Sequence, residues 1–101
     1  MNQIFLIGRL TSNLELKEEN ERKICKFTLA VHRDFKNEEG IYETDFIKCV
    51  SRDTIAEKIC EYCKKGDLVS VKGRIENLWE DNLDYEIIAE KLSFLSSSKG
   101  E

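Results

Sequence analysis

Hydrophobic and polar side chains alternate along most of the chain, which is the pattern of β-strands that bury one face. In the clearest case Cys25, Phe27 and Leu29 fall on one face, while Lys26 and Thr28 fall on the other. The first strand differs, because its nearly continuous apolar run predicts a buried strand with a bend or bulge at its glycine. Five segments are predicted as strands, namely residues 4–10, 24–35, 42–50, 67–75 and 85–95.

After residue 53 the apolar residues recur at the spacing of a helix. Asp53 or Thr54 is expected to cap the N-terminus of this helix, and Gly66 is expected just beyond its C-terminus. The apolar face consists of Ile55, Ala56, Ile59, Cys60 and Cys63. A single helix between the third and fourth of five strands predicts an all-β chain with the OB-fold, a small five-stranded Greek-key barrel.

Composition and charge narrow the class of protein. The chain has 101 residues, of which 41% are hydrophobic and 36% are charged, as in a single soluble domain. It begins without the features of a signal peptide and contains no apolar run of about 20 residues, so we expect an intracellular protein with reduced cysteines. The net charge of -4 counts against a simple polyanion binder. A binding face depends on local charge, however.

The C-x-x-C pair formed by Cys60 and Cys63 suggests a redox or metal site. A redox pair lies at the N-terminus of a helix, where the dipole lowers the thiol pKa, whereas this pair falls in the last turns. A structural zinc site needs four ligands, but Cys25 and Cys49 stand apart on strands and His32 is the only histidine. We therefore expect cysteines packed in the core, because a buried free cysteine behaves as a small hydrophobe.

No catalytic pattern is present in the sequence. The five glycines stand apart, so the chain has no glycine-rich phosphate loop. His32 has no evident nucleophile beside it. We therefore predict a binding protein rather than an enzyme, with no cofactor and no metal.

Five stretches, in this order and with plausible spacing, resemble the bacterial single-stranded DNA-binding proteins: IFLIGRLTSNLEL, FTLAVHRDFKNEEG, TDFIKCV, AEKICEYCKKGDLVSVKGRI and IIAEKLSFL. The resemblance covers residues 1–95 and leaves residues 96–101 as a short polar end. It implies an OB-fold domain that binds single-stranded DNA with little sequence preference during replication, recombination or repair. It also implies a homo-oligomer, typically a tetramer with a dimer as the alternative, at the nucleoid in the bacterial cytoplasm.

The resemblance assigns roles to individual residues. Phe35 and Phe46 match two aromatic residues on which bases stack, and Lys48 matches a basic or polar position. Periodicity alone favours a core position for Phe46, whereas the resemblance implies that its side chain points outward to bind DNA. Arg52 stands where a third aromatic residue is usual, although a guanidinium can also stack on a base. Trp79 matches a fourth aromatic only by position, and packing at a subunit interface is an equal alternative.

Cations near these positions are expected to contact phosphates, and they are Arg9, Arg33, Lys36, Lys72 and Arg74. Lys48 and Arg52 are expected to hold phosphate as well, with ordinary surface charges as the alternative. Phe5, Phe27 and Phe94 lie in apolar runs and are expected in the core.

Two departures from the family pattern leave a second function open. The first loop is rich in glutamate, which predicts repulsion of phosphate at one end of the site. Relatives end in a flexible acidic tail that recruits replication and repair proteins, whereas this chain stops at SSSKGE, as a tail-less or truncated member would. The acidic net charge, the missing aromatic residue at Arg52 and the missing tail favour an alternative, namely an OB-fold accessory protein that acts mainly through protein–protein contacts and binds DNA weakly.

Overall fold

The fold is described by a computed structural model that covers residues 1–78 and 83–97. Its elements in chain order are β1 (Ile4–Leu10), β2 (Lys17–Glu19), β3 (Arg22–Lys36), β4 (Tyr42–Arg52), α1 (Asp53–Tyr62), β5 (Leu68–Asn77) and β6 (Tyr85–Ser96). All five predicted strands and the helix are present. The short β2 pairs with the start of β3 and lengthens one side of the barrel.

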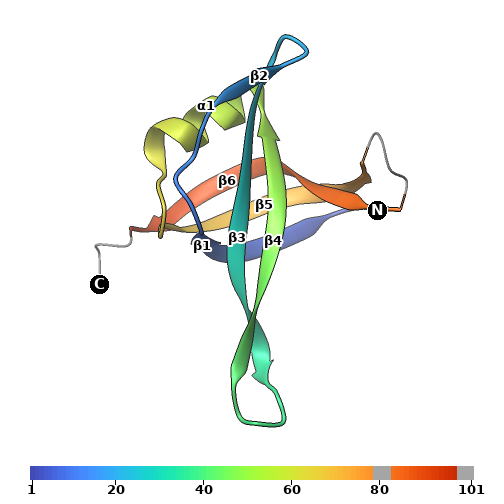
Figure 1. Ribbon diagram of the computed structural model, residues 1–101, viewed down its shortest axis with the longest axis vertical. Helices are drawn as coiled ribbons and strands as arrows, with labels where there is room; N and C mark the ends of the chain where they lie inside the picture. Colours follow the sequence, from blue (N-terminus) through green and yellow to red (C-terminus); the bar gives the residue numbers. More distant parts are fainter. Residues whose placement is uncertain (79–82, 98–101) are drawn as a thin grey trace.

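The strands form one closed sheet in the order β1-β5-β6-β4-β3-β2, and β1 also pairs with β3. That second pairing joins the two sides of the sheet into a barrel, with α1 inserted between β4 and β5. The predicted OB-fold is thus confirmed. The long β3–β4 hairpin runs across the barrel and projects well beyond it, while α1 lies on the opposite side of the barrel from β1 (Figure 1).

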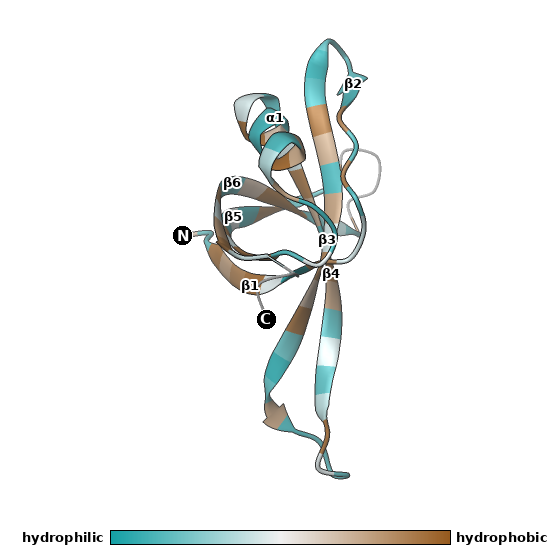
Figure 2. Cartoon of the chain, turned by 90° about the vertical axis from the view of Figure 1, so that its left-hand side faces the viewer, coloured by the Kyte–Doolittle hydropathy of each residue, from teal (hydrophilic) through white to brown (hydrophobic). Residues whose placement is uncertain are grey.

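The core lies inside the barrel, and hydrophobic segments meet there (Figure 2). Cys25, Cys49 and Cys63 are buried in this core, and Cys60 packs against it, as predicted. Burial raises the pKa of the Cys25 and Cys49 thiols to about 12, so both stay protonated at neutral pH. Within residues 1–78 and 83–97, no group of three or more His, Cys, Asp or Glu side chains is placed to hold a metal ion.

The prediction that Phe5 and Phe94 lie in the core is wrong. Phe27 is buried, but Phe5 is 69% exposed and Phe94 is 50% exposed. Only one face of a barrel strand points inward, so β1 turns Leu6 toward the core and leaves Phe5 and Ile7 outside. The continuous apolar run of β1 therefore belongs to a strand whose outer face is also apolar, and not to a strand buried on both faces.

Both expected ends of the helix are corrected by the structure. Asp53 is the first helical residue, at a φ of +57°, and no side chain caps the N-terminus. Its carboxylate instead accepts a hydrogen bond of 2.6 Å from Arg22 on β3. The helix ends at Tyr62, and Gly66, with a φ of +91°, lies in the turn that follows.

Two glycines permit backbone contacts that a side chain would block. A Cβ atom on Gly8 would lie 2.6 Å from the carbonyl oxygen of Ala30, where β1 approaches β3. A Cβ atom on Gly73 would lie 2.0 Å from the carbonyl oxygen of Ile88, next to a register shift between β5 and β6. These contacts involve backbone atoms, which cannot move aside as the end of a flexible side chain can.

We predict that Gly73→Ala lowers the free energy of unfolding by about 1–3 kcal/mol, because the added methyl group forces the two strands apart. Urea denaturation followed by circular dichroism measures the change. Ser70→Ala on the same strand is the control and is expected to stay within about 0.5 kcal/mol of the parent protein. Equal stability of the two variants contradicts the role assigned to Gly73.

Candidate nucleic-acid interface

Strand pairing places several of the predicted site residues in rows across one face of the barrel. Arg9 pairs with Ala30, and Ala30 pairs with Phe46, so these side chains share a face across β1, β3 and β4. Thr28 and Lys48 form the next row on the same face. Phe46 is 68% exposed, so its ring and the neighbouring Lys48 ammonium both face solvent. The orientation of Phe46 thus follows the resemblance and not the simple periodicity.

The same face deepens into a groove toward the other end of β4. The next rows pair Lys26 with Val50, and Ile24 with Arg52. Val50 and Ile24 are buried here because Ile88 of β6 packs over them in a second small cluster. Leu78 and residues 84–88 around the start of β6, called the β5–β6 arm below, therefore form a wall beside the strand face.

Two adjoining cavities, of about 510 Å³ and 450 Å³, make up this binding groove. Both are lined by Lys26, Leu78 and Glu86. The larger reaches Arg52 and the smaller reaches Lys48, so the groove continues from the row that contains Phe46. An extended chain can therefore follow the strand face from the exposed ring into the groove.

Lys26 and Tyr85 are among the groove residues that sequence reasoning missed. Lys26 shares the outer face with Lys48, and strand alternation alone was a sufficient signal for it. Tyr85 starts β6, is 65% exposed and lines the smaller cavity. Its place in the groove depends on how the β5–β6 arm folds back, which no local pattern indicates.

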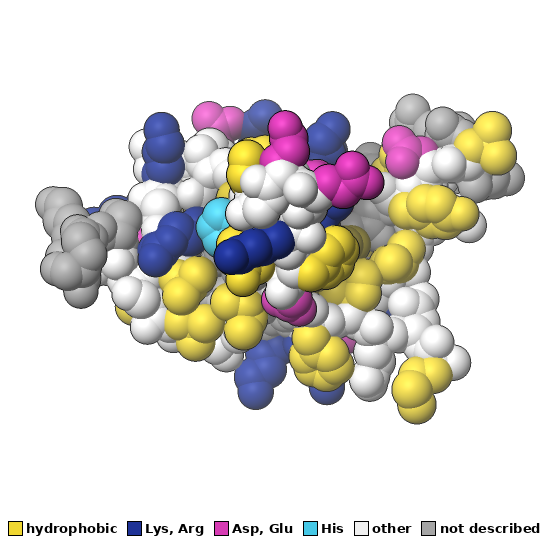
Figure 3. Space-filling view, turned by 90° about the horizontal axis from the view of Figure 1, so that it is seen from below, with side chains coloured by type: hydrophobic (Ala, Val, Ile, Leu, Met, Phe, Trp, Pro, Cys, Tyr) yellow, Lys and Arg dark blue, Asp and Glu magenta, His cyan; other side chains and the backbone are white. Residues whose placement is uncertain are grey.

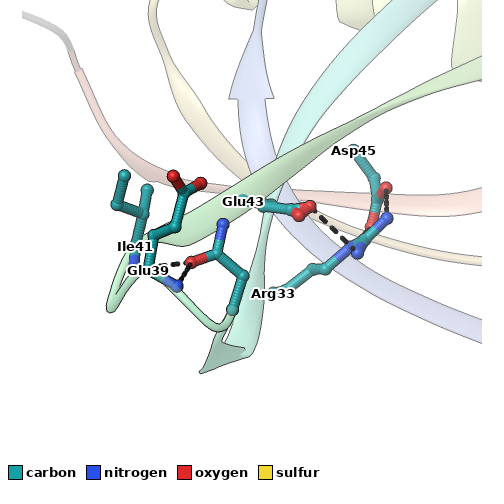
Figure 4. A network of polar contacts seen from close by, with 6 residues as sticks. Arg33, Glu39, Ile41, Glu43 and Asp45 are labelled. Carbon is teal, nitrogen blue, oxygen red and sulfur yellow. Dashed lines mark hydrogen bonds and ion pairs between the residues drawn. The ribbon is translucent and has the colours of Figure 1, made fainter.

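Arg33, by contrast, lies on the other face of the hairpin. Its guanidinium donates two hydrogen bonds to Asp45, at 3.0 Å and 2.9 Å, and contacts Glu43 at 3.4 Å (Figure 4). Asp45 pairs with Val31 and therefore alternates with Phe46 to the opposite side of β4. The hydrogen bond from Arg33 lowers the pKa of the Asp45 carboxyl below its usual value, so the pair stays charged at neutral pH.

The hairpin tip carries two further aromatic rings. Phe35 is 66% exposed near the end of β3, and the Lys36 ammonium lies 5.6 Å from the centre of the Tyr42 ring. The tip itself is a tight turn in which the Asn37 side-chain oxygen accepts hydrogen bonds from the backbone N–H groups of Glu39 and Ile41 (Figure 4). Lys36 pairs with Tyr42, so these two side chains share the face of Phe46, whereas the neighbouring Phe35 alternates to the other side of the hairpin.

The other predicted phosphate-binding cations differ in whether a carboxylate already neutralises their charge. Arg74 contacts both Glu76 and Glu90 at 2.6 Å, so its charge is largely neutralised. Lys72 lies 5.9 Å from the centre of the Phe5 ring and lines a separate cavity on the outer side of β1 and β5.

Two cations on the groove face also have partners, and acidic groups reach the groove. The Arg9 guanidinium donates a hydrogen bond of 2.9 Å to the carbonyl oxygen of Gly66. Arg52 contacts Glu86 at 3.8 Å. Glu19 lines the larger cavity, as the glutamate-rich first loop led us to expect. Trp79 lies outside the described residues.

A closed OB barrel with exposed aromatic rings and cations along a groove defines an oligonucleotide-binding type of barrel. The model of the single-strand binding protein family matches residues 1–95, and the chain belongs to this family. It is 39% identical to single-stranded DNA-binding protein 1 of Streptococcus pyogenes serotype M18, over 94% of this chain and 78% of that protein.

Two further relatives are longer than this chain. The single-stranded DNA-binding protein of Halalkalibacterium halodurans is 41% identical over 94% of this chain and 61% of its own length. Single-stranded DNA-binding protein A of Bacillus subtilis is 37% identical over 99% of this chain and 62% of its own length. The chain thus spans less than two thirds of both of these relatives.

We predict that Glu86→Gln strengthens binding of oligo(dT), because it removes a negative charge from the groove and releases Arg52 for phosphate. One additional phosphate contact should steepen the plot of log affinity against log salt by about 0.7. Fluorescence anisotropy of labelled oligo(dT) at several salt concentrations measures the slope. Glu61→Gln makes the same charge change on the exposed surface of α1 and should leave the slope unchanged; equal slopes for the two variants contradict the prediction.

Proposed function

We propose that this chain binds single-stranded DNA with little sequence preference and protects it during replication, recombination or repair. The observation that carries the proposal is the exposed Phe46 ring beside Lys48, at the entrance of a groove that also holds Lys26 and Arg52. Membership of the single-strand binding protein family supports it. The proposed location is the bacterial cytoplasm, at the nucleoid.

The chemistry of the groove suits an unpaired strand. A base stacked on an aromatic ring contributes about 1–3 kcal/mol, and stacking tolerates any sequence because every base has a π-face. Phe46 offers such a ring, and Tyr85 offers a second ring in the groove wall. A duplex hides the faces of its bases, so this arrangement selects single strands.

The charges of the groove shape the expected affinity. Arg33 and Arg74 are each held by two carboxylates, and Arg52 is held more loosely by Glu86. Fewer cations are therefore free to neutralise phosphates than the sequence alone suggests, and stacking carries a larger share of the affinity. A groove of this size on the strand face favours DNA binding over the alternative of an accessory protein with weak DNA binding.

We also propose that the chain forms a homo-oligomer, with a tetramer favoured and a dimer as the alternative. Phe5 is 69% exposed and Ile7 is 60% exposed on the outer face of β1, beside a shallow cavity of about 270 Å³. Several groups of hydrophobic side chains are exposed when the molecule is seen from below (Figure 3). An exposed apolar patch of this kind marks a surface that another protein covers.

No helix in the described part of the chain has the length and apolar character needed to cross a membrane.

We predict that Phe46→Ala weakens binding of poly(dT) by about 1–3 kcal/mol and leaves the free energy of unfolding nearly unchanged, because the ring faces solvent. Fluorescence anisotropy measures the binding, and urea denaturation measures the stability. Phe27→Ala is the matched control. Its ring is 4% exposed, so its removal should cost about 3–5 kcal/mol of stability.

The two phenylalanine variants separate a binding role from a structural one. If Phe46→Ala binds poly(dT) as tightly as the parent chain, Phe46 does not stack on bases. If it unfolds as easily as Phe27→Ala, the ring serves the core. Failure of the parent chain itself to bind poly(dT) below high micromolar concentration would exclude the proposed function.

We predict that the double substitution Phe5→Asp and Ile7→Asp converts the oligomer into monomers, because charged groups on the outer face of β1 resist burial between chains. Sedimentation velocity measures the mass. Ile41→Asp is the control, because Ile41 is equally exposed but lies at the hairpin tip. An unchanged mass after the double substitution shows that the chains associate through another surface.

A further inference from the structure

A second cavity lies away from the binding groove, between α1 and β6. It has a volume of about 490 Å³, and its apolar lining includes Ile55, Ile59 and Leu92. Two aromatic residues line it as well, Tyr62 at 68% exposure and Phe94 at 50% exposure. The exposure of Phe94, which strand alternation did not predict, arises because α1 leaves this α1–β6 cleft open.

The charges beside the cleft are not balanced. Lys58 of α1 and Lys91 of β6 both line it, and neither has a carboxylate within 4.0 Å among the described residues. Glu90 also lines the cleft, but its carboxylate is held by Arg74 at 2.6 Å. In a chain with a net charge of -4, two unpaired lysines beside an apolar hollow form a local positive site.

We propose that the α1–β6 cleft docks a short segment of a partner protein that carries acidic residues next to a bulky apolar side chain. The apolar side chain fills the hollow formed by Ile55, Ile59 and Leu92, and the acidic residues reach Lys58 and Lys91. An amphipathic segment binds an apolar groove through such an anchor, while complementary charge orients it. The proposal goes beyond DNA binding and uses none of the groove residues.

The lining of the cleft favours a peptide over the two other possible occupants. The hollow contains Ile55, Ile59 and Leu92 beside its two rings, and these apolar side chains suit an apolar side chain better than the polar sugar and phosphate groups of a nucleotide chain. A second copy of the chain has a different candidate surface at Phe5 and Ile7, whose cavity shares Lys91 with the cleft but none of the apolar residues of the cleft. The two unpaired lysines select a partner with local negative charge.

The probe for the test is a fluorescein-labelled, C-terminally amidated peptide of sequence Asp-Asp-Leu-Phe-Glu-Asp. We expect saturable binding by fluorescence anisotropy, with the amide signals of Lys58, Tyr62 and Phe94 shifting in ¹⁵N-resolved NMR spectra. The double substitution Lys58→Glu and Lys91→Glu should weaken binding at least about tenfold, because both rim charges are reversed. Replacing the Leu-Phe pair of the peptide by Ser-Ser should abolish binding.

Lys48→Glu is the matched control, because it reverses a lysine in the groove and should leave peptide binding unchanged. Circular dichroism checks that each variant is folded. Oligo(dT) should still bind the Lys58→Glu and Lys91→Glu double variant, so loss of peptide binding alone is distinguishable from failure of the proposed DNA-binding function.

Four results would overturn the proposal. The first two are the absence of saturable binding up to millimolar peptide and shifts confined to the groove. The third is displacement of the peptide by oligo(dT) with shifts at the same cleft residues. The fourth is loss of the oligomer in the single variant Lys58→Glu, which is the variant to use because Lys91 also lines the cavity beside Phe5 and Ile7. The third result makes the cleft a nucleic-acid surface. The fourth makes it a contact between copies of the chain.

Discussion

The close approach of backbone atoms at Gly8 and Gly73 is the constraint on which the rest of the structure depends. Gly8 lets β1 turn from β5 toward β3, where Arg9 and Ala30 then pair. That pairing closes the barrel and also brings Arg9 into line with Phe46. Gly73 lets β6 lie against β5 at the register shift, from which β6 reaches β4 and supplies the groove wall. The core and the proposed binding face therefore arise from the same two contacts, because a barrel that stayed open would have neither.

The residues that the sequence placed correctly are those governed by strand alternation. Cys49 faces inward and Phe46 faces outward because neighbouring side chains on a strand point to opposite sides. Alternation does not say which side is the core, and here only the family resemblance turned Phe46 outward. In β1 both faces are apolar, so the sequence could not show that Phe5 remains exposed.

Contacts between distant segments explain the predictions that failed or were missed. Asp53 is a residue type that often caps a helix, but its carboxylate accepts a hydrogen bond from Arg22 on β3 instead. A local sequence pattern cannot predict an ion pair with a residue on a distant strand. Tyr85 joins the groove because the start of β6 lies beside β4 in the sheet. The α1–β6 cleft was not predicted for the same reason, because it depends on how α1 packs against β6. Local rules thus predicted the elements and the alternation within each strand, whereas the side that faces the core and the cavities depended on how the elements pack against one another.

The position of Arg52 in the groove makes it a stronger candidate for a phosphate contact than the sequence alone indicated. It replaces a usual aromatic residue, yet the structure puts it in the groove, where its side chain is only 29% exposed and stands beside the buried Ile24 and Val50. Its contact with Glu86 spans 3.8 Å, whereas Arg33 makes two short hydrogen bonds to Asp45. A long single contact is easier to exchange for a phosphate than a bidentate pair, since less hydrogen bonding is lost. Of these two arginines, Arg52 is therefore the better candidate for a phosphate contact, because its contact with Glu86 leaves it beside the groove.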